Sequence, residues 1–283
     1  MRKYNENIIG FVEYFNKLIV EENRFNYYFL EHSLNSVLNG SVNYYDAWIY
    51  KNENTWICGL WIDGNYYLYG KNWEKSDVKK IVDNIDFSIF QKGFHFVGDY
   101  KLVNEIFNIN KIDTKDFKNR YFYQLKSKND LIIDYKHQIE IPKESDIPEL
   151  AEMYQQYFKE EYKGTNNKTL NEMETSIIKM IEDGKIYINK IETEVSGFCS
   201  TMLMFSNSPV YLIGTLYVKK KFRNKNIAKS LLSVTTEKLL EKAKTCYLMT
   251  EMENEPSNKV VEKIGFKNIN CHVDKTITGV NSV

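Results

Sequence analysis

Residues 210–240 constrain the fold most strongly, because they join an apolar strand pattern to a helical pattern through a short cationic turn. The strand pattern reads VYLIGTLYV, the turn reads KKKFRNKN, and the helix begins with IAKSLLSVTTEKLL. The turn carries five cations, at Lys219, Lys220, Lys221, Arg223 and Lys225. The first backbone N–H groups of a helix have no partner inside it and carry partial positive charge. The segment therefore predicts an anion site at the start of this helix.

The overall charge narrows the choice of anion. Lys and Arg together number 38 among 283 residues, and Asp and Glu together also number 38. No global field attracts DNA, RNA or anionic lipid, so a polyanion site must be local. A phosphate cradle is favoured over a nucleic-acid surface, and a solvated loop that happens to precede a helix remains the simpler alternative.

Cysteine usage and hydrophobic patterning indicate the compartment. The four cysteines are far apart, without the paired spacing of a metal site: Cys58, Cys199, Cys246 and Cys271. They read as reduced, packed thiols. Residues 1–25 mix charges with apolar residues, unlike a signal peptide, and no stretch reaches membrane-spanning length. We predict a cytoplasmic monomer or homodimer without a membrane or nucleic-acid partner.

The first half predicts an alternation of helices and strands. Apolar spacing favours helices over 9–19 and 29–38, the second of which ends at Gly40. Three antiparallel strands follow over 46–70, broken at Asn54 and at Asp63-Gly64, a hairpin signal. The remaining predicted elements are a helix over 77–90, a strand over 94–98, a helix over 101–108, a strand over 120–126 and a polar linker over 127–130.

The second half repeats this order. A strand over 137–142 precedes helices over 146–162 and 170–182, and three strands follow over 185–218. Both halves therefore give helices, a meander, and then a strand and a helix, which favours an internal duplication. We predict an α/β chain with one domain over 1–130 and a second over 131–283.

The segment after the cationic turn adds a second motif. Residues 246–269 predict a strand, a capped helix and a glycine that ends it. Over about 137–275 the chain resembles the GNAT superfamily of acyl-CoA-dependent N-acyltransferases. Its R/Q-x-x-G-x-G/A turn appears here as Arg223, Asn226 and Ala228. Its N-x-x-A-x-x-L-Y-x-K-x-G-F segment appears as Asn254, Ser257, Val260, Val261, Lys263, Gly265 and Phe266.

The resemblance implies two GNAT-like domains, each a mixed, mainly antiparallel sheet flanked by helices. The second would bind acetyl-CoA as co-substrate and transfer its acetyl group to a primary amine by direct attack. The first would be degenerate, because it lacks a cationic turn; its nearest candidate is GDYKLVNEI, residues 98–106. The alternative function is a non-catalytic protein that binds acyl-CoA or another partner. The acceptor cannot be identified from the sequence.

The same resemblance implies the donor-binding residues. Pantetheine would lie along Leu216, Tyr217 and Val218, and the pyrophosphate would lie on the turn and the helix start, formed by Arg223, Asn224, Lys225, Asn226, Ile227, Ala228 and Lys229. Asn254, Ser257 and Lys263 of the second motif complete the set. Because Asn226 replaces a glycine, and Asn tolerates positive φ, we expect a left-handed conformation there.

The resemblance identifies the catalytic groups less clearly than the donor-binding residues. Val261 replaces the family's tyrosine, which reprotonates the CoA thiolate, so Tyr217, Tyr247 or water would supply that proton. Glu251 is the candidate proton acceptor, with a surface carboxylate as the alternative. Glu160 and Glu161 lie where the family's acceptor loop would sit and could attract a cationic amine, but they are interpreted as solvated helix-end charges. The four histidines, His32, His95, His137 and His272, read as structural.

Overall fold

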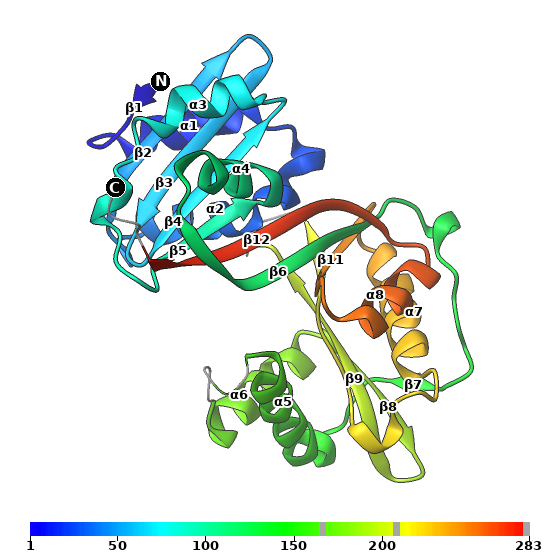
Figure 1. Cartoon of the computed structure of the whole chain (residues 1–283). Helices are drawn as coiled ribbons and strands as arrows, with labels where there is room; N and C mark the ends of the chain where they lie inside the picture. Colours follow the sequence, from blue (N-terminus) through cyan, green and yellow to red (C-terminus); the bar gives the residue numbers. More distant parts are fainter. Residues whose placement is uncertain (163, 165–167, 206–209, 280–283) are drawn as a thin grey trace. The chain divides into compact units, whose positions relative to one another are not determined.

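The chain divides into two compact units, each of which contains residues from more than one stretch of the sequence (Figure 1). The computed structural model describes all residues except 163, 165–167, 206–209 and 280–283. The first unit contains residues 1–122, 249–253 and 268–283, and the second contains 123–248 and 254–267. The predicted boundary between 130 and 131 stays a prediction.

The first unit is built on a mainly antiparallel sheet. Its strands, in sheet order, are β1 (Arg2–Lys3), β2 (Tyr44–Asn52), β3 (Thr55–Ile62), β4 (Asn65–Lys71), β5 (His95–Asp99), β12 (Lys267–Gly279) and β6 (Asp113–Leu125). Strands β4 and β5 run parallel, from Asn65↔His95 to Leu68↔Gly98. The predicted hairpin at Asp63-Gly64 is confirmed, with Gly64 at φ 71°.

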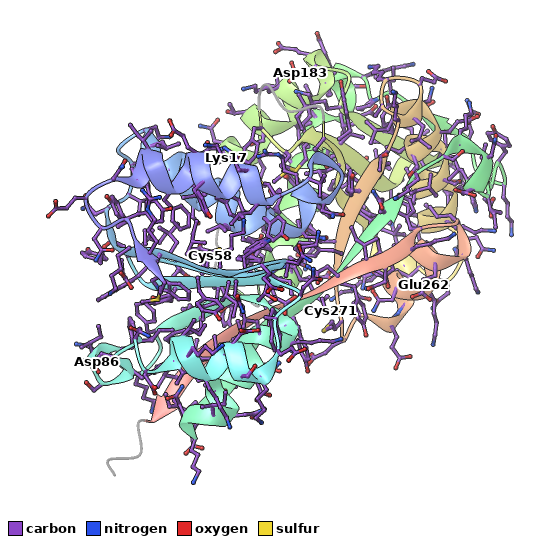
Figure 2. All side chains as sticks on the ribbon, turned by 90° about the horizontal axis from the view of Figure 1, so that it is seen from above. Lys17, Cys58, Asp86, Asp183, Glu262 and Cys271 are labelled. Atoms are coloured by element: carbon purple, nitrogen blue, oxygen red, sulfur yellow. The ribbon has the colours of Figure 1, made fainter. Side chains whose placement is uncertain are left out.

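Two helical layers cover the two faces of this sheet. Helices α1 (Ile8–Leu18) and α2 (Tyr28–Leu38) lie on one face, and α3 (Lys75–Val82) and α4 (Tyr100–Asn110) lie on the other (Figure 1). Neighbouring strand residues alternate between the two cores: Ile57 packs with α3 and α4, whereas Cys58 packs with α1 and α2. Figure 2 labels Cys58 on its strand. This period of two makes the strands apolar on both faces.

The helix predicted over 77–90 is shorter in the structure. It ends at Val82, and a separate 3₁₀ turn forms at Phe87–Ile89. The carboxylate of Asp86 accepts a hydrogen bond from the Ser88 N–H at 3.0 Å. Such a local cap competes with continuation of the α-helix, which explains the break.

The second unit repeats the arrangement. Its strands, in sheet order, are β11 (Cys246–Glu251, of which residues 249–251 belong to the first unit), β10 (Tyr211–Val218), β9 (Glu194–Leu203), β8 (Ile186–Ile191) and β7 (Ile139–Glu140). Helices α5 (Ile147–Glu161) and α6 (Leu170–Glu182) share an apolar core with β8, β9 and β10. Helix α7 (Ile227–Leu240) packs against β9 and β10, and α8 (Glu255–Lys263) follows β11.

The order of elements is the same in the two halves of the chain. β1 to β6 with α1 to α4 correspond one by one to β7 to β12 with α5 to α8. The last strand of the second half, however, belongs to the first unit, where β12 pairs with β5. The predicted fold class, a mixed and mainly antiparallel sheet flanked by helices, is confirmed. Strand β12 was not among the predicted elements.

The four cysteines are free thiols, and three of them are buried. Among the described residues, no helix is long and apolar enough to span a bilayer. No cluster of three side chains suited to a metal ion occurs in that part of the chain either.

Candidate functional site

The parallel pair at the centre of the second unit separates soon after it begins. β10 registers with β11 at Tyr211↔Cys246 and Leu212↔Tyr247, and no further pair is registered among the described residues. On its other side β10 stays paired with β9 as far as Val218, across a bulge between Ile213 and Leu216. The later part of β10 therefore faces β11 without a registered strand partner.

The turn after β10 leaves a row of backbone amides available. Asn224 and Asn226 both have positive φ, 64° and 67°, which confirms the left-handed conformation expected at Asn226. The Asn226 side chain caps no amide of α7. Within the described part of the chain, the N–H groups of residues 224–229 donate to no protein acceptor. Amides left open around left-handed residues at a helix start form an anion-binding nest.

Carboxylates hold most of the cations of this turn. Lys219 bonds to Glu149 and also to Glu194, at 2.8 Å from the latter. Lys221 also bonds to Glu194, at 2.6 Å. Lys220 and Arg223 both pair with Glu160. Three glutamates thus offset part of the charge of five cations, so the turn is a locally balanced network rather than a uniformly basic patch.

Lys225 is the exception in this network. Among the described residues, its ammonium group makes no ion pair with a carboxylate, and it lies 5.3 Å from the centre of the Phe222 ring. Its side chain is exposed. Lys225 is therefore the cation of the turn most available to an incoming anion.

Glu160, in the last turn of α5, joins this helix to β10 and to the cationic turn. Its carboxylate accepts hydrogen bonds from the Tyr217 hydroxyl at 3.1 Å and from Arg223 Nη2 at 2.7 Å. Arg223 Nε donates to the Val218 carbonyl at 3.0 Å, which fixes the guanidinium at the end of the strand. The expectation that Glu160 is a solvated helix-end charge is wrong, because the fold brings two strong donors to it.

These contacts shift both titrations. Burial raises the pKa of the Glu160 carboxyl, but Arg223 and the Tyr217 hydroxyl lower it further, so the net shift is downward. Burial and the neighbouring Glu160 charge raise the pKa of Tyr217 to about 12. Glu160 therefore stays anionic near neutral pH, and Tyr217 stays protonated.

A segment before β7 fixes the turn and the start of α7. His137 Nε2 donates to the Lys225 carbonyl at 2.8 Å. The carboxylate of Asp134 accepts from Ser230 Oγ at 3.0 Å and pairs with Lys229 Nζ at 3.3 Å. Lys229, one of the predicted donor-binding residues, thus has its ammonium group directed to Asp134.

The second predicted motif forms α8 and its caps. Asn254 is the N-cap, and its side-chain oxygen accepts from the Ser257 N–H at 3.2 Å. Lys263 is exposed in the last turn. Gly265 follows at φ 109°, and a Cβ there would lie 2.1 Å from the Asp130 carbonyl oxygen, so only glycine fits. The prediction that Gly265 terminates this helix is confirmed.

Comparison with known proteins identifies the domain that carries this site. Residues 147–266 match the model of the Acetyltransferase (GNAT) family. These residues form a GNAT domain. A search of curated proteins returns no match.

Solved structures share the fold over most of the chain. An acetyltransferase of the GNAT family from Colwellia psychrerythraea is 14% identical, with a TM-score of 0.55, over 83% of this chain and 85% of its own. A GCN5-related N-acetyltransferase from Sphaerobacter thermophilus is 10% identical, with a TM-score of 0.53, over 81% and 78%. At these identities the likeness concerns the fold.

The candidate proton-transfer groups of the GNAT domain differ in their surroundings. Val261 is buried and carries no proton to give. The buried Tyr247 hydroxyl accepts from Gln124 Nε2 at 3.0 Å. Tyr217 is engaged by Glu160. Val261 has no hydroxyl group, and the hydroxyls of Tyr217 and Tyr247 both contact other protein groups.

Glu251, the candidate base, belongs to the first unit and is described with it. Its carboxylate lies 2.6 Å from Lys118 Nζ, whose side chain is only 6% exposed. Protonation of Glu251 would leave a buried ammonium group without this counter-ion, which is costly. The proton-acceptor role of Glu251 stays a prediction, and this ion pair counts against it.

The matching turn of the first half is acidic. Element order pairs β10 and α7 with β4 and α3, so the counterpart of the cationic turn lies between Lys71 and Lys75, and not in the segment 98–106 that the sequence suggested. At the start of α3 the Asp77 carboxylate accepts from the Glu74 N–H at 3.1 Å, and the Asp77 N–H donates to the Glu74 carbonyl at 2.9 Å.

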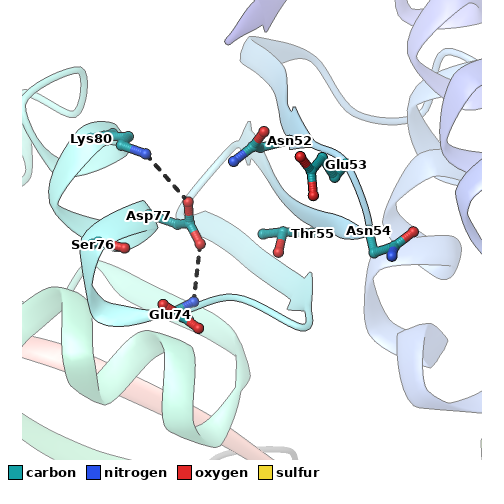
Figure 3. Close-up of a pocket in the computed structure, with 8 residues that line it drawn as sticks. All are labelled: Asn52, Glu53, Asn54, Thr55, Glu74, Ser76, Asp77 and Lys80. Carbon is teal, nitrogen blue, oxygen red and sulfur yellow. Dashed lines mark hydrogen bonds and ion pairs between the residues drawn. The ribbon is translucent and has the colours of Figure 1, made fainter.

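An open polar hollow of about 270 Å³ borders this helix start (Figure 3). Three carboxylates and one ammonium group are among the side chains that line it: Glu53, Glu74, Asp77 and Lys80. A phosphate would meet net negative charge here. Strands β4 and β5 also approach each other closely. A Cβ on Gly98 would lie 1.8 Å from the Leu68 carbonyl oxygen, so a larger residue would clash there.

Proposed function

We propose that the chain is an N-acetyltransferase, which transfers the acetyl group of acetyl-CoA to a primary amine of an unidentified acceptor. The observation that supports this best is the row of amides at residues 224–229 that donate to no protein acceptor, beside a strand edge without a registered partner. The GNAT match of the same segment agrees with it. Only the second unit would bind the donor.

In this proposal, the amides of 224–228 hold the CoA pyrophosphate, and the exposed Lys225 adds positive charge. The Arg223 N–H, which the sequence placed in the same set, already donates to the Lys220 carbonyl at 3.3 Å. Pantetheine lies along residues 216–218 and takes up backbone groups of β10 that face β11. The remaining predicted residues, Asn254, Ser257 and Lys263, border the donor from α8. The Asn254 side-chain oxygen and the Ser257 N–H are already bonded to each other, so these two residues would contact the donor through other atoms.

The reaction proceeds by direct attack. The amine nitrogen forms a bond to the thioester carbonyl carbon, the C–S bond breaks and the CoA thiolate leaves, while the proton lost by the amine nitrogen passes to water or to the thiolate. Positioning of the two substrates and backbone donors to the developing oxyanion provide the acceleration. A thiol with a pKa of about 8.5 leaves without obligatory protonation, and general acid catalysis contributes roughly 10² to 10⁴-fold, so Val261 slows the reaction without abolishing it.

A non-catalytic acyl-CoA-binding protein is the second candidate. It is favoured by the buried Val261 and by the engagement of the Tyr217 hydroxyl with Glu160. Both candidates fit a cytoplasmic protein with reduced cysteines, as a monomer or a homodimer.

Two measurements test the proposal. CoA or acetyl-CoA at millimolar concentration should raise the melting temperature, because a ligand that binds only the native state stabilises it. Release of free thiol from acetyl-CoA with a panel of primary amines then separates the two candidates. No thermal shift would refute donor binding, and a shift without amine-dependent thiol release would favour the binding protein.

A further inference from the structure

The ion pair between Arg223 and Glu160 lies within the turn that is proposed to receive a diphosphate. Three groups besides Arg223 face the Glu160 carboxylate: the Tyr217 hydroxyl, the Gln156 side chain and, at 3.7 Å, Lys220 Nζ. Glu160 is therefore held firmly beside the cations, at a point where a negative charge opposes the binding of an anion.

We propose that Glu160 is an internal counter-ion of the phosphate turn, which competes with the donor's diphosphate for Arg223 and thereby sets the affinity for the donor. This inference rests on the proposed function. It assigns a specificity-determining role to a residue outside both sequence motifs, contributed by α5 rather than by the turn itself.

The geometry supports competition rather than simple positioning. Arg223 is already fixed by its Nε donation to the Val218 carbonyl and by the Tyr217 ring, 5.6 Å from its guanidinium carbon. It therefore keeps its place without the carboxylate. What Glu160 adds is charge: it neutralises Arg223 and lies near Lys220, so it removes positive potential from the turn.

The consequence is discrimination among anions. A weak monoanion gains too little to displace a carboxylate that already has a charge-assisted bond at 2.7 Å. A diphosphate can also accept hydrogen bonds from the open amides of 224–229. These additional bonds provide enough free energy to displace the Glu160 carboxylate from Arg223. Glu160 thus selects against small anions and in favour of ligands that fill the whole nest.

The Glu160→Gln variant separates charge from position, because the amide oxygen can still accept from Tyr217 and Arg223. We expect this variant to bind CoA and inorganic diphosphate about three- to tenfold more tightly than the wild type in calorimetry at low salt, with a smaller gain at high salt. Glu152→Gln, on the exposed face of the same helix, is the matched control and should change neither affinity. In an Arg223→Gln background, Glu160→Gln should give a clearly smaller gain, because only its effect on Lys220 and on the potential of the turn remains.

Equal or weaker binding in Glu160→Gln, with normal binding in the wild type, would overturn the inference and leave the proposed function intact. A gain of the same size in Glu152→Gln, or in the Arg223→Gln background, would also overturn it. A wild type that binds neither CoA nor diphosphate would refute the proposed function and this inference together.

Discussion

Replacement of Asn226 isolates the backbone geometry of the phosphate turn from its side-chain chemistry. The residue has φ 67° and ψ 8°, its side chain caps nothing, and it is exposed. Asn226→Ile therefore loses no hydrogen bond, but it places a β-branched residue in the left-handed region. That conformation costs an ordinary residue roughly 1–2 kcal/mol, and β-branched residues tolerate it least.

If this strain displaces the amides of the nest, CoA affinity should fall about 5- to 30-fold, since 1.4 kcal/mol corresponds to a factor of ten. Asn226→Gly removes the strain and should stay within a few-fold of the wild type, because its added chain flexibility costs roughly 0.5–1 kcal/mol. Calorimetric titration with CoA measures both. Asn224, at φ 64°, provides an independent pair of variants with the same expected pattern. Equal CoA affinity in the Gly and Ile variants would refute the reasoning.

Two further predictions concern charge. Replacement of Arg223 and Lys225 by Glu should abolish CoA binding, while the thermal unfolding transition persists. The wild-type protein should bind one CoA per chain. A stoichiometry of two would show a phosphate site in the first half. His272 is buried among Phe29, Phe122 and Tyr69, and within the described chain neither ring nitrogen has a hydrogen-bond partner. Burial, with Arg120 nearby, lowers the pKa of His272 well below its ordinary value, so the unfolded chain binds a proton that the folded chain does not. Stability should therefore fall as the pH drops below about 6.5, by up to about 1.4 kcal/mol per pH unit from this group. His272→Phe should reduce that dependence and raise the melting temperature at pH 5; an unchanged pH profile of unfolding would contradict the assignment.

Elements with strong local signals could be predicted from the sequence. Helix α6 begins and ends at the predicted residues, 170 and 182, and the capping box of Thr169 and Glu172 accounts for its start. The hairpin at Asp63-Gly64 and the left-handed Asn226 follow in the same way from residue types with specific φ preferences. These features depend on a few neighbouring residues, so the sequence contains what determines them.

Features that depend on distant partners could not be predicted. Nothing in the sequence indicates that the last turn of α5 lies against Tyr217 and Arg223, which follow Glu160 by 57 and 63 residues. The sequence indicates 98–106 as the nearest counterpart of the phosphate turn, whereas the structural counterpart precedes α3, because the match between the halves appears only when whole elements are aligned. Segment 267–279 alternates apolar and polar residues, with Ile269, Cys271, Val273 and Ile277 on one face, but alternation alone does not indicate which strand it will pair with.

The pairing of β12 with β5 has a consequence for synthesis of the chain. Val273 and Ile277 complete the same buried core as Trp48 and Ile57, and they are translated long after β5. At ribosomal rates of about 5–20 residues per second, β5 waits roughly ten to thirty seconds for its neighbour. During that time one edge of an otherwise formed sheet is exposed to pairing with other chains. A nascent chain that stalls before residue 267 would retain this exposed edge, so closure of this core depends on a strand that is synthesised long after the strand it covers.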